Sequence, residues 1–462
     1  MDKLKCFVYL HLILLTLLIS VNTYAVTIHV PKDELTIQSG IDAAVDGDTV
    51  LVAKGVYKGL GNVNLDFKGK KILVKSESGP NGTIITGSRT PYTRGFNFIN
   101  KETVDSVLDG FTIRNGSFPN GGGIYILNSS PTIRNCVIEM NRAVDEGRFT
   151  GQGGGIYVKN SNTRIIKCTI RNNHAESTYG GGIFFEGDRE DVVFFPDRIY
   201  QPSIDKSIIE GNTGSGIYSR EYIQTHINNS EISRNTLQGI VATSFQRSGT
   251  LISNCVIAQN TGGGVECGEF SILEIQDSII QQNTGVIGGG IFGGPTAEIV
   301  ATNCIIAQNI AQRWGGGIGI KSKLGGSTFN NCTVTRNVSE ERGGGVYVFS
   351  EGASFVMSKS IVWGNSSNGT HDEVFVSGPS ITIMNSDIKD GLEGIGKEPD
   401  GVQFVFEENI DSDPLFVNPD RSDYRLGVNS PAVGMGANEI SQNPLNVSYK
   451  GKMTLKWGDL KR

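Results

Sequence analysis

Histidine is scarce in this chain of 462 residues, with 5 in total, and no Cys-x-x-Cys pair occurs. A structural zinc site needs four Cys or His ligands at close spacing, so the sequence offers no such site. The 41 Lys and Arg residues are scattered and are outnumbered by 47 Asp and Glu, which gives a net charge of −6. Because binding to phosphate needs a concentrated basic surface, nucleic acid is not an expected partner.

Long apolar runs are absent beyond the first 25 residues, so we expect no membrane-spanning helix in the mature protein. Within those residues, Lys3 and Lys5 precede an apolar run over 7–19, and residues 23–25 (Thr-Tyr-Ala) suit a cleavage site. This pattern is typical of a secretory signal peptide. We therefore expect residues 1–25 to be removed and the mature protein to be secreted or displayed at the cell surface.

A sustained helical period of 3.6 residues is also missing, whereas glycine is abundant, at 61 residues. Three glycines followed by Ile or Val recur, with copies beginning at Gly121, Gly153, Gly180, Gly262, Gly288, Gly315 and Gly343 and weaker copies at Gly216 and Gly239. Repeats at this period indicate a solenoid, in which each unit buries its apolar face only against its neighbours.

A second repeat, Cys/Ser-x-Ile/Val-x-x-Asn, follows most of the glycine clusters. Its copies are mostly 23 to 32 residues apart and end at Asn141, Asn173, Asn212, Asn235, Asn260, Asn283, Asn309, Asn337 and Asn365. The Cys/Ser and Ile/Val positions are two residues apart, so both side chains face the interior of a strand. Asn suits a turn, and asparagines stacked about 4.8 Å apart would form a hydrogen-bonded ladder. We therefore predict an all-β fold, a parallel β-helix with coils over residues 61–391.

The two ends of the chain depart from the repeat. Residues 26–60 are expected to hold an N-terminal cap and the first strand, with a helix over 35–45 that places Ile37, Ile41 and Val45 on one face. Such a helix would cover the apolar open end of the solenoid. Residues 392–440 are expected to form an irregular C-terminal cap, followed by a polar tail over 441–462.

These ends and repeats resemble known proteins. Residues 37–44, 47–50 (Gly-Asp-Thr-Val) and 55–57 (Gly-Val-Tyr) resemble the opening segment of secreted bacterial proteins of the pectin-lyase-like right-handed β-helix superfamily. The Gly-Gly-Gly-Ile and Asn repeats are similar to those of polymorphic outer-membrane proteins. Residues 413–416 (Asp-Pro-Leu-Phe) with 430–432 (Ser-Pro-Ala) are similar to the closing coil of many secreted β-helix proteins. The resemblance implies a single-stranded right-handed β-helix, but the superfamily includes lyases, hydrolases, epimerases and adhesins, so it implies no single activity.

Six cysteines follow the predicted signal peptide, and five of them share the Cys/Ser position of the repeat. This placement indicates small buried core residues. Secretion would permit disulfides, and two pairs, Cys136 with Cys168 and Cys304 with Cys332, would be neighbours on adjacent coils, about 4.8 Å apart. Side chains stacked in parallel seldom reach the torsion of a disulfide, so we favour free thiols.

The resemblance also suggests which catalytic groups to look for. The hydrolase pattern of Asn-x-Asp, Asp-Asp, Gly-His-Gly and Arg-x-Lys on successive coils is absent, which argues against a pectin hydrolase. A uronate lyase would need a Lys or Arg base, usually with Ca²⁺ held by acids.

The best place for such groups is an insertion over residues 186–200. Asp188, Glu190 and Asp191 are its candidate Ca²⁺ ligands, and Arg171, His174 and Arg198 are candidate catalytic groups facing the same cleft. The alternative is a solvated loop that packs its two phenylalanines over the flank of the solenoid.

Six aromatic residues each follow an inward Ile or Val and are candidates for ligand binding: Tyr125, Tyr157, Phe184, Tyr218, Phe292 and Tyr347. They should point outward and stack along one sheet, with breaks at Glu266 and Gly319. Aromatic faces would suit pyranose rings. Alternatively, the aromatics are there because they favour strands and pair well with their neighbours.

Three functions remain open. The favoured one is a secreted or cell-surface scaffold that binds extracellular polysaccharide, or other cell-surface components, without evident catalytic machinery. The second is a polysaccharide lyase or epimerase that acts on uronate-containing glycans with Ca²⁺. The third is an adhesin or autotransporter-like passenger. No series of amphipathic strands of about ten residues follows the repeats, so we expect no barrel for self-export.

Overall fold

A computed structural model describes residues 24–88, 92–147, 150–188, 199–243, 248–323, 325–350, 352, 354–369, 372–378, 380–398 and 403–437. Nearly all of the predicted signal peptide and the whole predicted polar tail lie outside these residues. Within the described ranges, no helix is long and apolar enough to cross a membrane.

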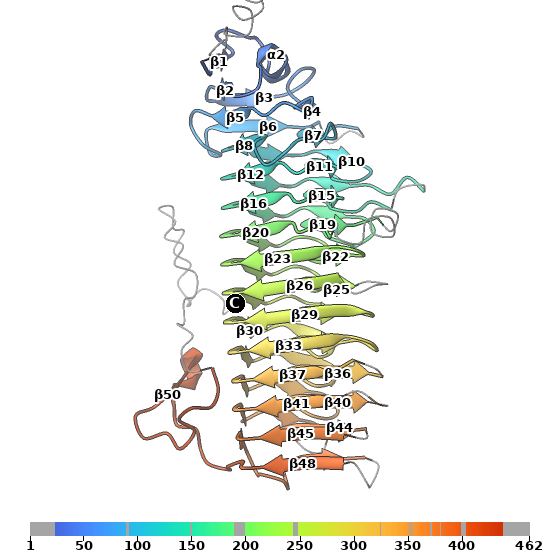
Figure 1. The fold of residues 1–462 in the computed structure, drawn as a ribbon, viewed down its shortest axis with the longest axis vertical. Coiled ribbons are helices and arrows are strands. Elements are labelled where there is room, and N and C mark those ends of the chain that lie inside the picture. The colour runs from blue at the N-terminus through green and yellow to red at the C-terminus, as the bar shows by residue number, and fades with distance from the viewer. Residues whose placement is uncertain are drawn as a thin grey trace, which may run out of the picture.

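The chain winds into a stack of coils, and each coil adds one strand to each of three long sheets (Figure 1). Neighbouring strands in these sheets pair in parallel and in register, as in Ile133, Ile165 and Ile204 on successive coils. These three side chains are fully buried, as are their counterparts on the other sheets, and together they form one continuous core. The predicted parallel β-helix is confirmed.

The three sheets are named here by the order in which a coil visits them after the glycine cluster: C, then A, then B. Sheet C comprises β4 (Leu65–Asp66), β7 (Phe96–Phe98), β11 (Ile124–Leu127), β15 (Ile156–Lys159), β19 (Ile183–Glu186), β22 (Ile217–Arg220), β25 (Ile240–Thr243), β28 (Val265–Cys267), β32 (Ile291–Gly293), β36 (Ile318–Ser322), β40 (Val346–Ser350), β44 (Val374–Ser377) and β47 (Ile395–Lys397). Sheet A comprises β1 (Thr27–Val30), β2 (Thr49–Val52), β5 (Leu73–Ser76), β8 (Val107–Asp109), β12 (Thr132–Arg134), β16 (Arg164–Ile166), β20 (Ser203–Asp205), β23 (Gln224–Asn228), β26 (Ser248–Ser253), β29 (Ser271–Gln276), β33 (Glu298–Thr302), β37 (Ser327–Asn330), β41 (Phe355–Ser358), β45 (Ser380–Met384) and β48 (Gln403–Glu407). Sheet B comprises β3 (Gly55–Tyr57), β6 (Thr83–Thr86), β9 (Thr112–Arg114), β13 (Val137–Glu139), β17 (Thr169–Arg171), β21 (Ile208–Glu210), β24 (Glu231–Ser233), β27 (Val256–Ala258), β30 (Ile279–Gln281), β34 (Ile305–Ala307), β38 (Thr333–Thr335), β42 (Ile361–Trp363) and β46 (Asp387–Ile388).

Two short sheets lie between sheet B and the next glycine cluster. One comprises β10 (Ser117–Phe118), β14 (Arg142–Ala143) and β18 (His174–Ala175), and the other comprises β31 (Thr284–Ile287), β35 (Ile310–Trp314), β39 (Val338–Ser339) and β43 (Ser366–Ser367).

The asparagine that closes each repeat is buried and belongs to the predicted ladder. From Asn141 to Asn365, each amide Nδ2 donates to the Oδ1 of the asparagine one coil further on, over 2.9–3.1 Å. The same Oδ1 atoms accept the backbone N–H of the preceding asparagine. At the C-terminal end, Asn365 Nδ2 donates to the Glu373 carboxylate over 2.6 Å, so this glutamate takes the place of the next asparagine.

The third glycine of each cluster packs against this ladder. A Cβ atom at Gly155 would lie 2.6 Å from the carbonyl oxygen of Gly182 and 3.0 Å from Asn173 Nδ2. Contacts this short are not tolerated by a real side chain, so the coils close only because the position is glycine.

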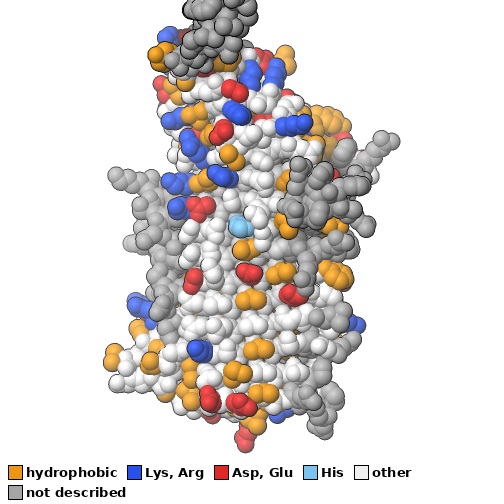
Figure 2. All heavy atoms as spheres, in the orientation of Figure 1, with side chains coloured by type: hydrophobic (Ala, Val, Ile, Leu, Met, Phe, Trp, Pro, Cys, Tyr) orange, Lys and Arg blue, Asp and Glu red, His pale blue; other side chains and the backbone are white. Residues whose placement is uncertain are grey.

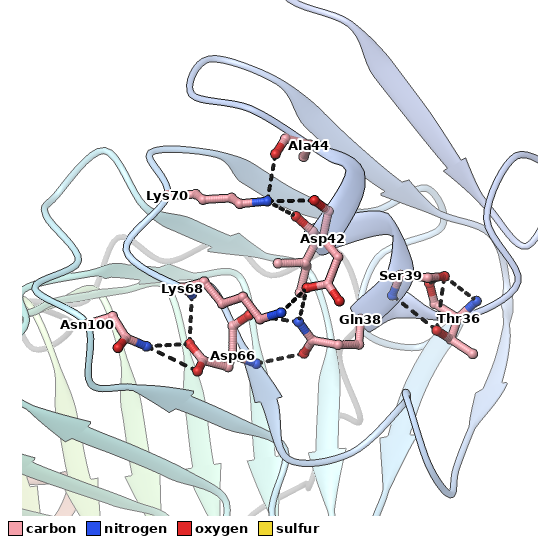
Figure 3. A network of polar contacts seen from close by, with 10 residues as sticks. Thr36, Gln38, Ser39, Asp42, Ala44, Asp66, Lys68, Lys70 and Asn100 are labelled. Atoms are coloured by element: carbon pink, nitrogen blue, oxygen red, sulfur yellow. Dashed lines mark hydrogen bonds and ion pairs between the residues drawn. The ribbon is translucent and has the colours of Figure 1, made fainter.

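At the N-terminus, helix α2 (Ile37–Ala43) begins at Thr36, whose hydroxyl caps Ser39 N–H, and Ile37 and Ile41 are fully buried in the common core. Lys70 Nζ donates to the carbonyl oxygens of Ile41, Asp42 and Ala44 at the end of the helix, as Figure 3 shows for two of these residues. The helix lies where the sequence predicts one, but Val45 was wrongly placed on its buried face. Val45 follows the helix and is 57% exposed. The role of α2 as a cap stays a prediction.

The C-terminal region differs from the expected irregular cap. Strands β47 and β48, within 392–440, form a further coil, and β1 and β2 show that the coils also begin before residue 61. The segment that follows holds β49 (Phe416–Asn418), the short 3-10 helix η1 (Pro419–Arg421) and β50 (Asp423–Leu426). It folds back along sheet B (Figure 1), where Tyr424 packs against Ile279 and Ile305.

All six described cysteines are buried and free, as favoured from the sequence. Burial raises the pKa of the Cys255 thiol to about 12, so this side chain is a protonated core residue.

Candidate functional site

A cluster of charged side chains lies where three strands of sheet C end, beside the predicted insertion. Lys159, Glu186 and Arg220 occupy equivalent positions on β15, β19 and β22. Glu186 lies between the two cations, 3.7 Å from Lys159 Nζ and 3.4 Å from Arg220 Nη2, and it accepts a hydrogen bond from Tyr157 Oη over 2.9 Å. The carboxylate is thus held by three partners from two neighbouring coils.

Asp188, a predicted Ca²⁺ ligand, belongs to the same cluster. Its carboxylate lies 3.1 Å from Lys159 Nζ, and its backbone N–H donates to Asn160 Oδ1 over 2.7 Å. Glu190, Asp191 and Arg198 lie outside the described residues. Among the residues that are described, no group of three His, Cys, Asp or Glu could hold a metal ion. The Ca²⁺ site therefore stays a prediction.

The Lys and Tyr side chains of this cluster are not available as bases. Burial alone would lower the pKa of Lys159, but Glu186 and Asp188 outweigh it and raise that pKa above its ordinary value. Burial and the Glu186 carboxylate likewise raise the pKa of Tyr157. Both side chains are therefore protonated at neutral pH and act as hydrogen-bond donors to the carboxylates.

Arg171, the first predicted catalytic group, lies on β17 of sheet B. Its Nε and Nη2 donate to Glu139 Oε2 over 2.9 and 2.7 Å. Arg171 and Asp188 thus have separate partners on different sheets, so the structure does not bring these two predicted site residues together.

His174, the second predicted catalytic group, lines an open groove of about 440 Å³ between sheet B and the short sheet β10–β14–β18. The groove is lined by Gly116, Ser117, Met140, Asn141, Arg142, Asn172 and His174. Arg142 is in register with His174 and forms an ion pair with Glu176, while Met140 is 39% exposed. Hydrogen-bonding side chains and an apolar one therefore share one accessible surface.

Sequence reasoning identified His174 but missed Arg142, Asn172 and Met140. Met140 and Asn172 occupy equivalent positions at the corner after sheet B, where the backbone is left-handed with φ of 54° at both residues. Arg142 directly follows a ladder asparagine. All three residues could have been found from the sequence by their place next to the asparagine that closes each repeat.

Most of the predicted aromatic residues of sheet C take part in ring stacks. Tyr125, Tyr157, Phe184 and Tyr218 form one run, with ring centroids 5.3–5.5 Å apart and planes within 14° of parallel. Tyr347 and Phe375 form a second run, which Trp314 joins from the end of β35. Val241, Glu266, Phe292 and Gly319 are successive in register between the two runs, so the column breaks at Val241 as well as at the predicted positions Glu266 and Gly319.

The orientation of these rings differs from that needed for sugar stacking. Because the rings stack on one another, their faces meet neighbouring rings rather than solvent. Tyr157 is 5% exposed and Phe184 is fully buried, and the free face of Tyr125 is covered by the Arg94 guanidinium at 4.7 Å. A pyranose ring cannot stack on the faces of Tyr157 or Phe184, so a binding role for the six aromatics stays a prediction without support from their packing.

Comparison with known proteins places the chain in a fold family. A family model described as a right handed beta helix region matches residues 60–201 and 154–312, which together span more than half of the chain. The chain belongs to this right-handed β-helix family. No curated protein sequence matches it.

Several solved structures of the pectin-lyase-like fold are similar to this chain. The periplasmic alginate epimerase AlgG is 10% identical, with 79% of this chain and 85% of that chain covered and a TM-score of 0.44. Pectate lyase Pel9A is 13% identical over 85% of this chain and 84% of that one, with a TM-score of 0.37. A mutant of the PL6 family alginate lyase AlyGC is 11% identical over 84% and 76%, with a TM-score of 0.38. At these identities the similarity concerns the fold alone.

Proposed function

We propose that this protein is a secreted β-helix scaffold that binds extracellular polysaccharide, or a polysaccharide of the cell surface, without catalysing a reaction. The groove beside His174 is its binding site. The observation that carries the proposal is the lining of that groove, where Arg142, Asn172 and His174 offer hydrogen bonds around the exposed thioether of Met140. Sugars present both hydroxyl groups and apolar C–H surfaces, so they suit such a lining.

Two further observations support a binding role over catalysis. Arg171, which directly precedes the groove residue Asn172, is held by Glu139 through two hydrogen bonds. In the charged cluster of sheet C, both Lys159 and Tyr157 have raised pKa values and stay protonated. The signal-peptide pattern over residues 1–25 supports export to the place where such polymers occur.

A polysaccharide lyase or epimerase is the second candidate, and one observation favours it. His174 and Arg142 line the same groove. An imidazole can accept the C5 proton of a uronate, and a guanidinium can neutralise its carboxylate while charge develops.

Binding is tested by electrophoresis of the mature protein through gels that contain uronate or neutral polysaccharides. We expect at least one polymer to retard the protein, and His174→Ala and Arg142→Ala to weaken the apparent affinity by about tenfold, as for loss of a charged hydrogen bond. Arg234→Ala is the matched control, because Arg234 also pairs with a glutamate, Glu210, but does not line the groove. Equal retardation of all four proteins would contradict the proposed site.

Catalysis is tested on the same polymers with and without Ca²⁺. Elimination produces unsaturated products that absorb in the ultraviolet, and epimerisation exchanges the C5 proton with deuterated water. Either signal, lost in His174→Ala, would replace the binding proposal with the enzymatic one.

A further inference from the structure

The outer face of sheet A carries a column of side chains in register across five coils. Arg164, Ser203, His226, Leu251 and Glu274 occupy it in turn, on β16, β20, β23, β26 and β29. His226 is the midpoint, with Arg164 two coils toward the N-terminal end and Glu274 two coils toward the C-terminal end. Each is therefore about 10 Å from the midpoint along the solenoid axis.

Neither end of this column has an ion-pair partner among the residues that the structure describes. Arg164 and Glu274 are both exposed, and neither forms an ion pair with any residue that the structure describes. Arg134 and Arg234, by contrast, form ion pairs with Asp109 and Glu210 on neighbouring coils. Two unpaired charges of opposite sign thus lie on one face at equal distances from its centre.

The centre of the column is hollowed and partly apolar. A groove of about 190 Å³ is lined by His226, Leu251, Glu274, Val300 and their neighbours. Val300 is 43% exposed, and His226 Nε2 is buried with no hydrogen-bond partner among the described atoms. This part of the face therefore offers a binding partner apolar contact area and a ring nitrogen of His226 that lacks a hydrogen bond, both next to the charged residues.

The charge on this face also changes sign along the axis. Figure 2 shows Lys and Arg side chains prevailing toward the N-terminal end and Asp and Glu prevailing below the centre. Lys167 and Lys206, both exposed, lie at the edge of sheet A on the basic half, directly after β16 and β20. A second copy turned end for end would place its acidic half against this basic half.

We propose that the outer face of sheet A binds the same face of a second copy, with the two solenoids antiparallel. The two-fold axis lies between the faces, runs along the strands and passes beside His226. It brings Arg164 of each copy opposite Glu274 of the other and the two His226 side chains together at the centre. A parallel arrangement would bring Arg164 against Arg164, so the charges select the antiparallel one. The His174 groove lies beside sheet B, so this interface is distinct from the proposed sugar site.

The interface is tested by sedimentation velocity and light scattering on the mature protein at low salt. We expect a dimer whose dissociation constant rises by at least about tenfold as salt screens the pairs. Arg164→Glu and Glu274→Arg should each weaken the dimer by a similar factor, because each creates two like-charge contacts. A wild-type protein that is monomeric over the whole concentration range would overturn the proposal.

Mixing the two variants gives the decisive measurement. One variant then presents two acids and the other two arginines, so the antiparallel interface regains both ion pairs and the mixture should dimerise as a heterodimer. The double variant R164E/E274R should dimerise like the wild type. Lys321→Glu, a reversal of an exposed charge on β36 of sheet C, is the control and should change nothing. Single variants that dimerise unchanged, or a mixture that stays monomeric, would each show that these residues do not face each other.

Discussion

Two stacks of like residues run along this solenoid, and they differ in continuity. The asparagine ladder, inside, extends over nine coils from Asn141 to Asn365 without a substitution. The aromatic stack of sheet C, outside the core, is interrupted at Val241, Glu266 and Gly319. The two stacks differ in continuity because replacing one residue has a different cost in each. A lost amide leaves buried donors without an acceptor, whereas a lost ring forfeits only stacking and some buried area.

Removing one amide from the middle of the ladder should have the largest effect on stability. In Asn235→Ala, the N–H and Nδ2 of Asn212 lose their shared acceptor, and the Ile209 carbonyl loses a donor. We expect the free energy of unfolding in urea to fall by about 3–5 kcal/mol. Gln259→Ala is the control, because Gln259 belongs to an amide row at the surface, donating to Gln282 over 3.0 Å, and should cost less than about 1 kcal/mol. If both variants lost the same unfolding free energy, burial would not explain the stability of the asparagine ladder relative to the glutamine row.

The end of the ladder should respond to pH, unlike its middle. Burial raises the pKa of Glu373 to about 7, although hydrogen bonds from Asn365 and Gly364 oppose the shift. The folded state therefore holds this proton more tightly than the unfolded state, in which glutamate titrates near 4.3. The stability contributed by the protonated form is complete below about pH 4 and is lost as pH rises through about 7, by up to about 3 kcal/mol.

This pH effect is measured as the difference in unfolding free energy between the wild type and Glu373→Gln from pH 4.5 to 8. As pH rises, the wild type should lose unfolding free energy relative to the Glu373→Gln variant. Using the difference removes the contribution of Asp387, whose pKa burial also raises, to about 6. A difference that is constant across this range would contradict the assignment.

A methyl group added where the glycine cluster meets the ladder should have an intermediate effect. In Gly155→Ala the new Cβ would lie 2.6 Å from the Gly182 carbonyl oxygen, so the coils must move apart, at a cost of about 1–3 kcal/mol. Gly249→Ala provides the contrast, because its nearest neighbour would be 3.6 Å away, and we expect a change within about 0.5 kcal/mol. Thermal unfolding of both variants checks the pair.

The smallest effect is expected in the aromatic stack. Phe184→Leu removes two stacked contacts, with Tyr157 and Tyr218, at a cost of about 1–2 kcal/mol. Phe292→Leu, next to Glu266 and Gly319 in register, should cost about half as much or less. Equal costs would show that the stacking of Phe184 adds nothing beyond its buried area.

Prediction from the sequence succeeded where the same residue type is required at the same position of every coil. The asparagines and the Cys/Ser position recur in phase, so their inward direction and their ladder could be inferred from spacing alone. The aromatic residues recur too, but the tilt of their rings depends on contacts between coils, and the expected open faces proved to be covered. Arg171 looked free in sequence because its partner, Glu139, is 32 positions away and becomes adjacent only when the coils stack.

Features that occur once were the least predictable. Glu373 sits where other coils have the third glycine, and nothing in its local sequence indicates that its carboxylate reaches the ladder. The segment containing Tyr424 has no repeat, so its path back along sheet B could not be inferred. The His174 groove was found only in part, because Met140 and Asn172 are recognisable as equivalent corner positions only once the coil geometry is known.

The ladder is directional, and this constrains how the protein can change in length. Every amide donates to the next asparagine toward the C-terminal end, and the last donor is received by the carboxyl group of Glu373 rather than by another amide. A duplicated coil inserted between Asn141 and Asn365 restores every hydrogen bond, whichever coil is copied. A ladder coil placed after Glu373 would not be joined in this way, because the Glu373 carboxyl group accepts from Asn365 but has no amide to donate to the next coil. Gene duplication can therefore lengthen the ladder from within, while the coils from Glu373 onward stay last.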